Sequence, residues 1–175
     1  MEKIIIIGAG GHGRVVIDAA LSNPDLEVIG FLDDGDIEDV LGVSRIGKIS
    51  DMEKFKEFKF HIAIGNNILR KELSEKIKVE NLITIVHPTA YISRDVEMGK
   101  GCFIGANVVL NSKSRLENSV IVNTGSIIEH DSILENYSHL SYGVLLGSKV
   151  TIKEDVYIEM GEIIKRGLIV ERDIR

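Results

Sequence analysis

The chain lacks several features that would assign it to a functional class at once. Its only cysteine, Cys102, cannot form a disulfide within the chain, which favours a reducing compartment. No cluster of Lys and Arg exceeds two or three residues and the net charge is −6, so the basic surface that nucleic acid or an anionic membrane attracts is missing. The apolar run KIIIIG at residues 3–8 is too short for a signal-peptide core or a membrane span. We therefore expect a cytoplasmic protein that binds neither nucleic acid nor membranes.

The first half of the 175-residue chain alternates strand and helix patterns. Strands are predicted at 3–8, 26–34, 58–65 and 81–88, and helical spacing of apolar residues is found at 13–22 and 66–78. Strands separated by helices predict a small, parallel, doubly wound sheet. We expect this Rossmann-like α/β domain to fill residues 1–86.

From residue 87 onward the chain follows a strict repeat of six. Every sixth residue from Ile92 to Val170 is aliphatic or Met, at fourteen positions without an insertion. The residue two positions before each of these is nearly always small or β-branched, so the pair alternates as the inward residues of a very short strand. Three such strands per turn predict a triangular solenoid with 18 residues per coil. Residues 87–175 are therefore predicted to form a hexapeptide β-helix.

A glycine-rich turn lies between the first predicted strand and helix. It matches G-x-G-x-x-G with the residues Gly8, Ala9, Gly10, Gly11, His12 and Gly13. Asp33 and Asp34 follow about twenty positions later, as in dinucleotide-binding folds, which predicts a nucleotide phosphate at the helix N-terminus. The alternative is a tight turn that needs glycine for positive φ. Four predicted strands without a second mononucleotide-binding half argue against a complete NAD site.

His130 interrupts the aliphatic run IIEHDSIL at residues 127–134, between Glu129 and Asp131. Because Ile128 is inward in the repeat, His130 is expected at a corner of the prism with its side chain facing outward. A histidine flanked by carboxylates could be oriented and basic enough to accept a proton near neutral pH. The alternative is a solvated polar corner without a catalytic role.

Two further polar residues lie in the same region of the chain. Asn123 is at a corner of the prism, and His139 follows His130 by nine residues. Nine residues are half a coil, so the two histidines can meet only between neighbouring chains. Zinc held by three histidines is the competing use, but the chain offers no third corner histidine at suitable spacing. We therefore expect no metal.

Five segments occur in a characteristic order, IIIIGAGGHGRVV, FLDD, AIGNN, VHPTA and VNTGSIIEHDSILENYSHLSYG. In that order they resemble the sugar O- and N-acetyltransferases related to sialic acid O-acetyltransferase, with UDP-bacillosamine N-acetyltransferase as the most similar type. The resemblance covers about residues 3–156. It implies a Rossmann-like domain that binds a nucleotide-activated sugar, followed by a left-handed β-helix that forms trimers with acetyl-CoA between adjacent chains.

The resemblance also implies roles for individual residues. His130 matches the general base, Asp131 the carboxylate that orients it, and Glu129 and Asn123 further catalytic positions. The acetyl-CoA site would include His139, Gly143 and Ser148, whose backbone N–H would meet the thioester oxygen. The implied nucleotide-sugar pocket consists of Gly8, Gly10, Gly11, His12, Gly13, Asp33, Asp34, Gly65 and Asn66.

The expected function is acetyl transfer from acetyl-CoA to an amino or hydroxyl group of a UDP- or CMP-linked sugar, directly in a ternary complex. Cys102 is inward in the repeat, which argues against an acyl-cysteine intermediate. Two other functions fit the same pattern. One is a trimeric sugar-nucleotide-binding protein without catalysis, and the other is an NAD-type binding domain fused to a solenoid scaffold.

Outward positions of the repeat predict the assembly. Phe103, Ile121 and His139 follow one another at intervals of 18 residues on one face, and apolar residues follow at the same interval on the next face. Flat apolar faces of this size favour burial in a closed cyclic assembly. We therefore expect a homotrimer in which these two faces meet and His139 of one chain approaches His130 of its neighbour.

Overall fold

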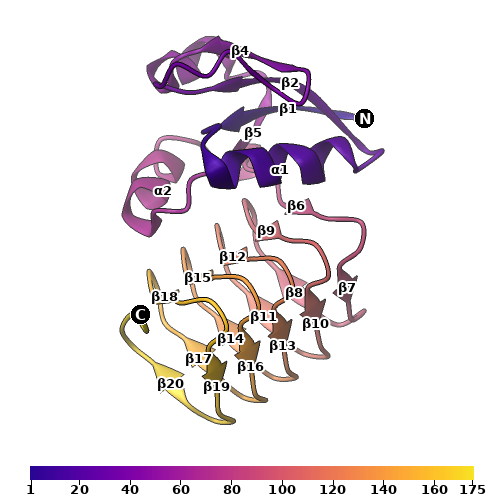
Figure 1. Ribbon diagram of the computed structural model, residues 1–175, viewed down its shortest axis with the longest axis vertical. Helices are drawn as coiled ribbons and strands as arrows, with labels where there is room; N and C mark the ends of the chain where they lie inside the picture. Colours follow the sequence, from indigo (N-terminus) through magenta and orange to yellow (C-terminus); the bar gives the residue numbers. More distant parts are fainter.

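The protein has two stacked parts, as its computed structural model of residues 1–175 shows (Figure 1). An α/β unit, here called the N-terminal unit, is built from residues 1–84, and a triangular prism of short strands begins at residue 85. The prism therefore starts two residues before the position where the repeat pattern predicts it. The first helix lies between the sheet of the N-terminal unit and the prism (Figure 1).

The N-terminal unit is a five-stranded sheet with helices on both faces. Its elements are β1 (Glu2–Ile7), α1 (Gly11–Leu21), β2 (Leu26–Leu32), β3 (Asp39–Val40), β4 (Val43–Gly47), η1 (Ile49–Phe55), β5 (Lys59–Ile62), α2 (Asn67–Ser74) and η2 (Val79–Asn81). The strand order is β3-β4-β2-β1-β5, parallel except for the β3–β4 hairpin. The four isoleucines of β1 at residues 4–7 are fully buried because α1 covers one face and η1 with α2 the other.

The prediction for the edges of this sheet is wrong in two places. The segment at 81–88 is not a strand of this sheet, because only Leu82 bridges to Phe60 and the chain then leaves for the prism. The sequence reading also missed the β3–β4 hairpin, which turns through Leu41 and Gly42 at positive φ. Short edge strands of mixed polarity have no clear hydrophobic period, so the sequence pattern neither detects them nor tells which sheet they join.

The prism consists of three parallel sheets of five strands each. Its strands are β6 (Ile85–Val86), β7 (Tyr91–Ile92), β8 (Glu97–Met98), β9 (Phe103–Ile104), β10 (Val109–Leu110), β11 (Arg115–Leu116), β12 (Ile121–Val122), β13 (Ile127–Ile128), β14 (Ile133–Leu134), β15 (His139–Leu140), β16 (Leu145–Leu146), β17 (Thr151–Ile152), β18 (Tyr157–Ile158), β19 (Ile163–Ile164) and β20 (Ile169–Val170). Within β10, Val109 pairs with Tyr91 below and Ile127 above, so each coil takes 18 residues. The fold is thus a Rossmann-like α/β unit followed by a left-handed parallel β-helix.

The interior of the prism is a continuous aliphatic column, as the period of six predicts. Every sixth residue from Ile104 to Val170 is buried in this one cluster. The smaller inward serines are also satisfied, since the Ser126 hydroxyl donates to the Ser141 carbonyl at 2.9 Å. At the corners between strands the backbone repeatedly takes positive φ, as at Asp131 (60°), which lets the chain turn sharply from one sheet to the next.

The sheet formed by β6, β9, β12, β15 and β18 is covered by the N-terminal unit of the same chain. Phe103 and Ile121 are 0% and 1% exposed because they pack in one cluster with α1 and β1, and His139 is 7% exposed. The expectation that this face packs against a neighbouring chain is therefore wrong. The repeat predicts that the face is apolar but cannot tell which partner covers it.

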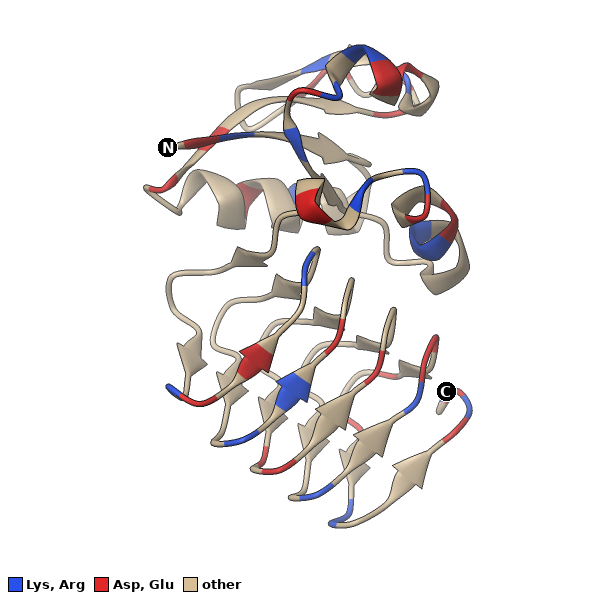
Figure 2. Ribbon diagram, turned by 180° about the vertical axis from the view of Figure 1, so that it is seen from behind, with Lys and Arg blue, Asp and Glu red and all other residues tan.

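Residues of both signs of charge are distributed along the ribbon of both parts (Figure 2). No helix is long and apolar enough to cross a bilayer. The sheet formed by β7, β10, β13, β16 and β19 has an apolar outer side. It exposes Tyr91 (61%), Leu145 (39%) and Ile163 (68%) along one flat face, with Val109 and Ile127 half-buried between them.

A Leu134→Ala substitution tests the importance of the aliphatic column. Leu134 is fully buried inside the prism, so the variant should lose about 2–5 kcal/mol of unfolding free energy through lost burial and a residual cavity. Ile169→Ala in the neighbouring stack, 62% exposed, is the matched control and should lose less than about 0.5 kcal/mol. Urea unfolding followed by circular dichroism measures both. Equal losses would contradict an interior held together by this column.

Candidate active site

The glycine-rich turn is shaped by two of its glycines and opened by two others. Gly8 has a φ of +95°, and a Cβ on Gly13 would lie 2.3 Å from the Gly8 carbonyl oxygen. Both positions therefore need glycine for the turn itself. A Cβ on Gly10 or Gly11 would meet nothing within 4 Å, so these two leave free space at the start of α1.

The N-terminus of α1 presents backbone N–H groups with no partner in the protein. The amides of Gly11, His12 and Gly13 donate no hydrogen bond, and Gly10 provides no side-chain cap. Unsatisfied N–H groups and the helix dipole together attract an anion such as a phosphate. The turn therefore has both properties that the sequence suggests. Two of its glycines are needed for its backbone conformation, and its free N–H groups are suited to an anionic ligand.

The two aspartates after β2 accept hydrogen bonds from backbone N–H groups, and Asp33 braces this turn. Asp33 accepts hydrogen bonds from the Ala9 N–H at 2.7 Å and from the Gly35 N–H at 2.7 Å. Asp34 accepts one from the Ile49 N–H at 3.0 Å. Each carboxylate therefore has a structural task, and Asp33 connects the end of β2 directly to the glycine-rich turn.

Two histidines meet beneath the turn, where the N-terminal unit contacts the prism. The His12 ring lies edge-on to Phe103, with ring centroids 5.2 Å apart, and 6.2 Å from the ring of His139. His139 donates from Nδ1 to the Gly65 carbonyl at 3.0 Å and packs edge-on against Tyr157. The Nε2 atoms of both histidines are buried without a partner. Buried polar atoms without a partner are rare in folded proteins, so these two nitrogens are candidates for contact with a water molecule, an ion or a ligand.

These histidines are uncharged at neutral pH. Burial, with smaller effects from His139, His61 and Arg70, lowers the pKa of His12 to about 3, and burial together with the positive charge of Arg70 lowers the pKa of His139 to about 4. A third histidine, His61, is also buried, with its pKa lowered to about 4, and it bonds to the Ile83 carbonyl at 2.9 Å. Since His139 donates from Nδ1, its free Nε2 is a hydrogen-bond acceptor.

His130 occupies a different environment, the exposed corner between β13 and β14. Its Nδ1 lies 2.7 Å from Asp131 Oδ2, and its side chain is 50% exposed. This hydrogen bond lowers the pKa of Asp131 below its usual value. Glu129 beside it accepts from the Asn111 side chain at 3.1 Å. The corner borders an open groove of about 580 Å³ lined entirely by polar residues, namely Asn111, Ser112, Lys113, Glu129, His130 and Asp131.

The predicted site residues therefore fall into three places on the chain. Glu129, His130, Asp131 and Ser148 share the corner that contains β13–β14 and, one coil further, β16–β17. Asn123 and Gly143 lie at the corner that follows β12 and β15. His139 joins His12, Gly65 and the glycine-rich turn on the sheet beneath the N-terminal unit.

Three residues with roles around the histidines escaped the sequence reading. Asn111 precedes Glu129 by 18 residues, so the coil period could have identified it. Tyr157 follows His139 by 18 residues, so the coil period could have identified it as well. Arg70, by contrast, sits in an ordinary amphipathic helix, and no sequence signal separates it from a surface arginine.

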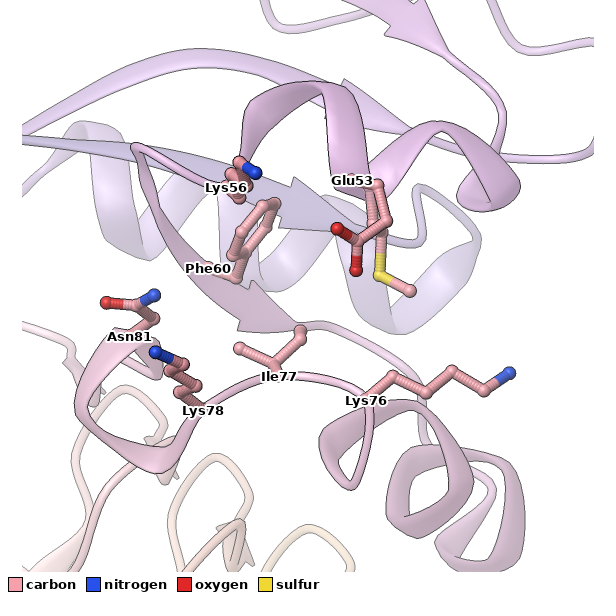
Figure 3. Close-up of a pocket in the computed structure, with 8 residues that line it drawn as sticks. Glu53, Lys56, Phe60, Lys76, Ile77, Lys78 and Asn81 are labelled. Carbon is pink, nitrogen blue, oxygen red and sulfur yellow. The ribbon is translucent and has the colours of Figure 1, made fainter.

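A separate cavity of about 240 Å³ lies between η1 and the segment after α2, away from all of these residues (Figure 3). Phe60 and Ile77 line it together with Lys56, Lys78 and Asn81. It contains none of the predicted site residues. No group of three or more His, Cys, Asp or Glu side chains is placed to hold a metal ion.

The chain is similar in sequence to known acetyltransferases. Residues 3–77 match the PglD N-terminal domain family. The chain is 30% identical over 115 residues to UDP-N-acetylbacillosamine N-acetyltransferase of Bacillus subtilis, an alignment that covers 61% of this chain. The chain spans only 24% and 52% of the lengths of two curated relatives that it matches.

Solved structures match nearly the whole chain. The acetyltransferase domain of PglB from Neisseria gonorrhoeae, in complex with acetyl coenzyme A, superposes with a TM-score of 0.78 at 29% identity, covering 99% of this chain and 92% of that one. A histidine-to-alanine variant of GDP-perosamine N-acetyltransferase from Caulobacter crescentus, in complex with CoA and GDP-perosamine, gives a TM-score of 0.83 at 28% identity, covering 99% and 90%.

The buried histidines predict a loss of stability in acid. Their pKa is 6.5 in the unfolded chain and about 3 to 4 in the folded protein, so below pH 6.5 the unfolded state binds more protons. The unfolding free energy should be fully present above pH 6.5 and fall as the pH drops towards 4. A His61→Asn variant removes one titrating group and should reduce the slope by about 1.4 kcal/mol per pH unit. Urea unfolding between pH 7.5 and 4.5 measures this, and an unchanged slope would contradict the buried neutral state of His61.

Proposed function

We propose that this chain transfers the acetyl group of acetyl-CoA to an amino group of a nucleotide-activated sugar, because it is similar to the PglD N-terminal domain over residues 3–77 and to proteins named as acetyltransferases. The observation that carries this proposal is the His130–Asp131 pair, with its 2.7 Å hydrogen bond, at an exposed corner beside a polar groove. Such a pair is arranged as a general base with an orienting carboxylate. The relatives named above as N-acetyltransferases support nitrogen rather than oxygen as the acceptor atom.

His130 would act as the base through Nε2. When its Nδ1–H donates to Asp131, the lone pair of Nε2 faces the groove. As the amine nitrogen attacks the thioester carbonyl carbon, a C–N bond forms and Nε2 takes up the amine proton. The imidazolium that results is stabilised by the negative charge of Asp131, and it returns the proton to the thiolate of CoA when the C–S bond breaks.

The negative charge that develops on the thioester oxygen needs a hydrogen-bond donor. The backbone N–H of Ser148 donates to no acceptor within the chain and lies at the same corner as His130, one coil further along. We assign it to the oxyanion because a fixed backbone donor stabilises the charged intermediate more than the neutral thioester. Direct transfer of this kind forms no covalent enzyme intermediate. Cys102 is suited to none, since it is fully buried and burial raises its pKa to about 11.

The nucleotide-sugar pocket lies elsewhere in the chain. The free N–H groups at residues 11–13 suit the diphosphate, and the unpaired Nε2 atoms of His12 and His139 suit polar groups of the sugar. These groups meet where α1 of the N-terminal unit covers the sheet that contains His139, whereas His130 is at the opposite corner of the prism. A sugar bound beside His139 would therefore meet His130 of a neighbouring chain.

We further propose a homotrimer that builds one site at each interface between chains. The apolar sheet that exposes Tyr91, Leu145 and Ile163 adjoins the His130 corner and would be buried by the neighbour. The β6-to-β18 sheet is already covered by the N-terminal unit, and the third sheet carries Glu97 and Arg115 on its outer face, so this apolar sheet is the face best suited to assembly. Acetyl-CoA would then lie between adjacent chains.

A His130→Ala variant tests the chemistry. Loss of the base should lower kcat by about 10²- to 10⁴-fold while the Kd for acetyl-CoA, measured by calorimetry, changes little. The control is His87→Gln, because His87 is hydrogen-bonded only to its neighbour Thr89 outside the groove. Assays use GDP-perosamine and UDP-N-acetylbacillosamine as acceptors. Unchanged turnover in the His130 variant would refute the assignment, and binding of both sugars without any acetyl transfer would identify a non-catalytic binding protein.

Mixed trimers test the shared site. A His130→Ala chain and a His139→Ala chain, each inactive alone, should recover about a quarter of wild-type activity when co-expressed at equal levels, because random cyclic assembly pairs two intact histidines at that frequency. Light scattering checks that every sample is trimeric. Full turnover by a monomer, or mixed trimers as inactive as the single variants, would contradict a site shared between chains.

A further inference from the structure

Arg70 of α2 is the largest fully buried side chain of the protein, at 1% exposure. Its guanidinium uses all three nitrogens. Nε donates to the Ser119 carbonyl at 3.0 Å, and Nη2 donates to Asn67 Oδ1 at 2.9 Å and to the Tyr137 carbonyl at 2.5 Å. Ser119 and Tyr137 are corner residues of two successive coils, so Arg70 joins the N-terminal unit to the prism.

The charge of this guanidinium has no carboxylate partner in hydrogen-bond contact. All of its acceptors are neutral oxygens, and Asp155, whose charge favours the protonated form through space, is itself paired with Lys71 at 2.8 Å. Burying a cation without such a partner costs free energy that an apolar side chain of the same volume would not incur. A side chain that only joined two surfaces would not need the charge. The forked guanidinium does, however, provide a third nitrogen that reaches beyond the joint.

The third nitrogen, Nη1, leads directly to the histidine cluster. It donates to the Ile64 carbonyl at 3.0 Å and to the Gly65 carbonyl at 3.3 Å. The Gly65 carbonyl is also the acceptor for Nδ1 of His139, at 3.0 Å. Arg70 therefore holds the loop after β5 in the one orientation in which a backbone carbonyl faces His139.

We propose that Arg70 is a positioning residue for His139. By holding the Gly65 carbonyl, it keeps the proton of His139 on Nδ1 and leaves Nε2 as a hydrogen-bond acceptor in the pocket. An acceptor at this place selects for a hydroxyl or amino group on the sugar. This last step rests on the proposed function, whereas the control of the His139 ring by Arg70 does not.

The chain offers a matched control on the same helix. Lys71 also spans the two parts of the protein, through ion pairs to Glu154 and Asp155, but it touches neither Gly65 nor His139. Lys71→Met therefore removes an inter-domain contact without altering the histidine. Arg70→Lys keeps the charge and removes the forked geometry that reaches Gly65, and Arg70→Met removes both.

The experiment measures the tautomer of His139 and the Michaelis constants of the same variants. In the wild type and in Lys71→Met, ¹⁵N spectra should show a protonated Nδ1 and an unprotonated Nε2. In Arg70→Lys the two nitrogens of His139 should report a mixture of tautomers. The KM for the nucleotide sugar, measured with GDP-perosamine and UDP-N-acetylbacillosamine, should rise about tenfold in this variant, as expected for one misplaced hydrogen bond, while the KM for acetyl-CoA changes less than about twofold.

The outcomes separate the two proposals. If Arg70→Lys and Lys71→Met lose the same thermal stability and both leave the His139 tautomer unchanged, Arg70 is only a structural link and the inference is wrong. If Arg70→Met does not fold, Arg70→Lys decides alone. If neither sugar is acetylated by the wild type, the proposed function fails, but the ¹⁵N spectra of the variants still decide the role of Arg70.

Discussion

The constant length of the coil is the constraint on which the rest of the structure depends. Each strand pairs with the strand 18 residues away, and the aliphatic column in the interior is buried only while this register holds. Corners with positive φ repeat at the same place in successive coils, as at Ser119, Tyr137 and Asp155. The position of a residue within the repeat therefore decides which sheet or corner it occupies, and polar groups such as His130 and Asp131 are held on a rigid frame.

The same frame separates two kinds of histidine. His139 lies in a sheet that the N-terminal unit covers, so burial and the charge of Arg70 lower its pKa to about 4 and make it a neutral acceptor. His130 precedes His139 by nine residues and lies at an open corner. Its half-exposed ring is oriented there by the hydrogen bond to Asp131. Chemically identical side chains acquire different tasks because one is desolvated and the other is not.

The joint between the two parts of the chain is more than a scaffold. It combines an apolar contact, in which Phe103 and Ile121 pack against α1, with a buried guanidinium whose acceptors come from both parts. The apolar contact supplies non-directional attraction, whereas the hydrogen bonds of Arg70 permit few relative orientations. Because the glycine-rich turn, Gly65 and His139 all border this joint, the orientation of the two parts also shapes the pocket.

The sequence by itself determined the elements whose signal is local or periodic. The column from Ile92 to Val170, the outward place of His130 and the strand-turn-helix at Gly8–Gly13 all follow from spacing, because a period of six or a glycine at positive φ admits few backbones. Only the tertiary structure decided what covers each face. An apolar stripe such as Phe103–Ile121 is equally suited to a neighbouring chain or to the chain's own helix, and residues 81–88 have the same strand pattern in either sheet. The role of Arg70 was hidden for the same physical reason, since burial of a charged side chain depends on contacts with residues up to 67 positions away, which no local pattern records.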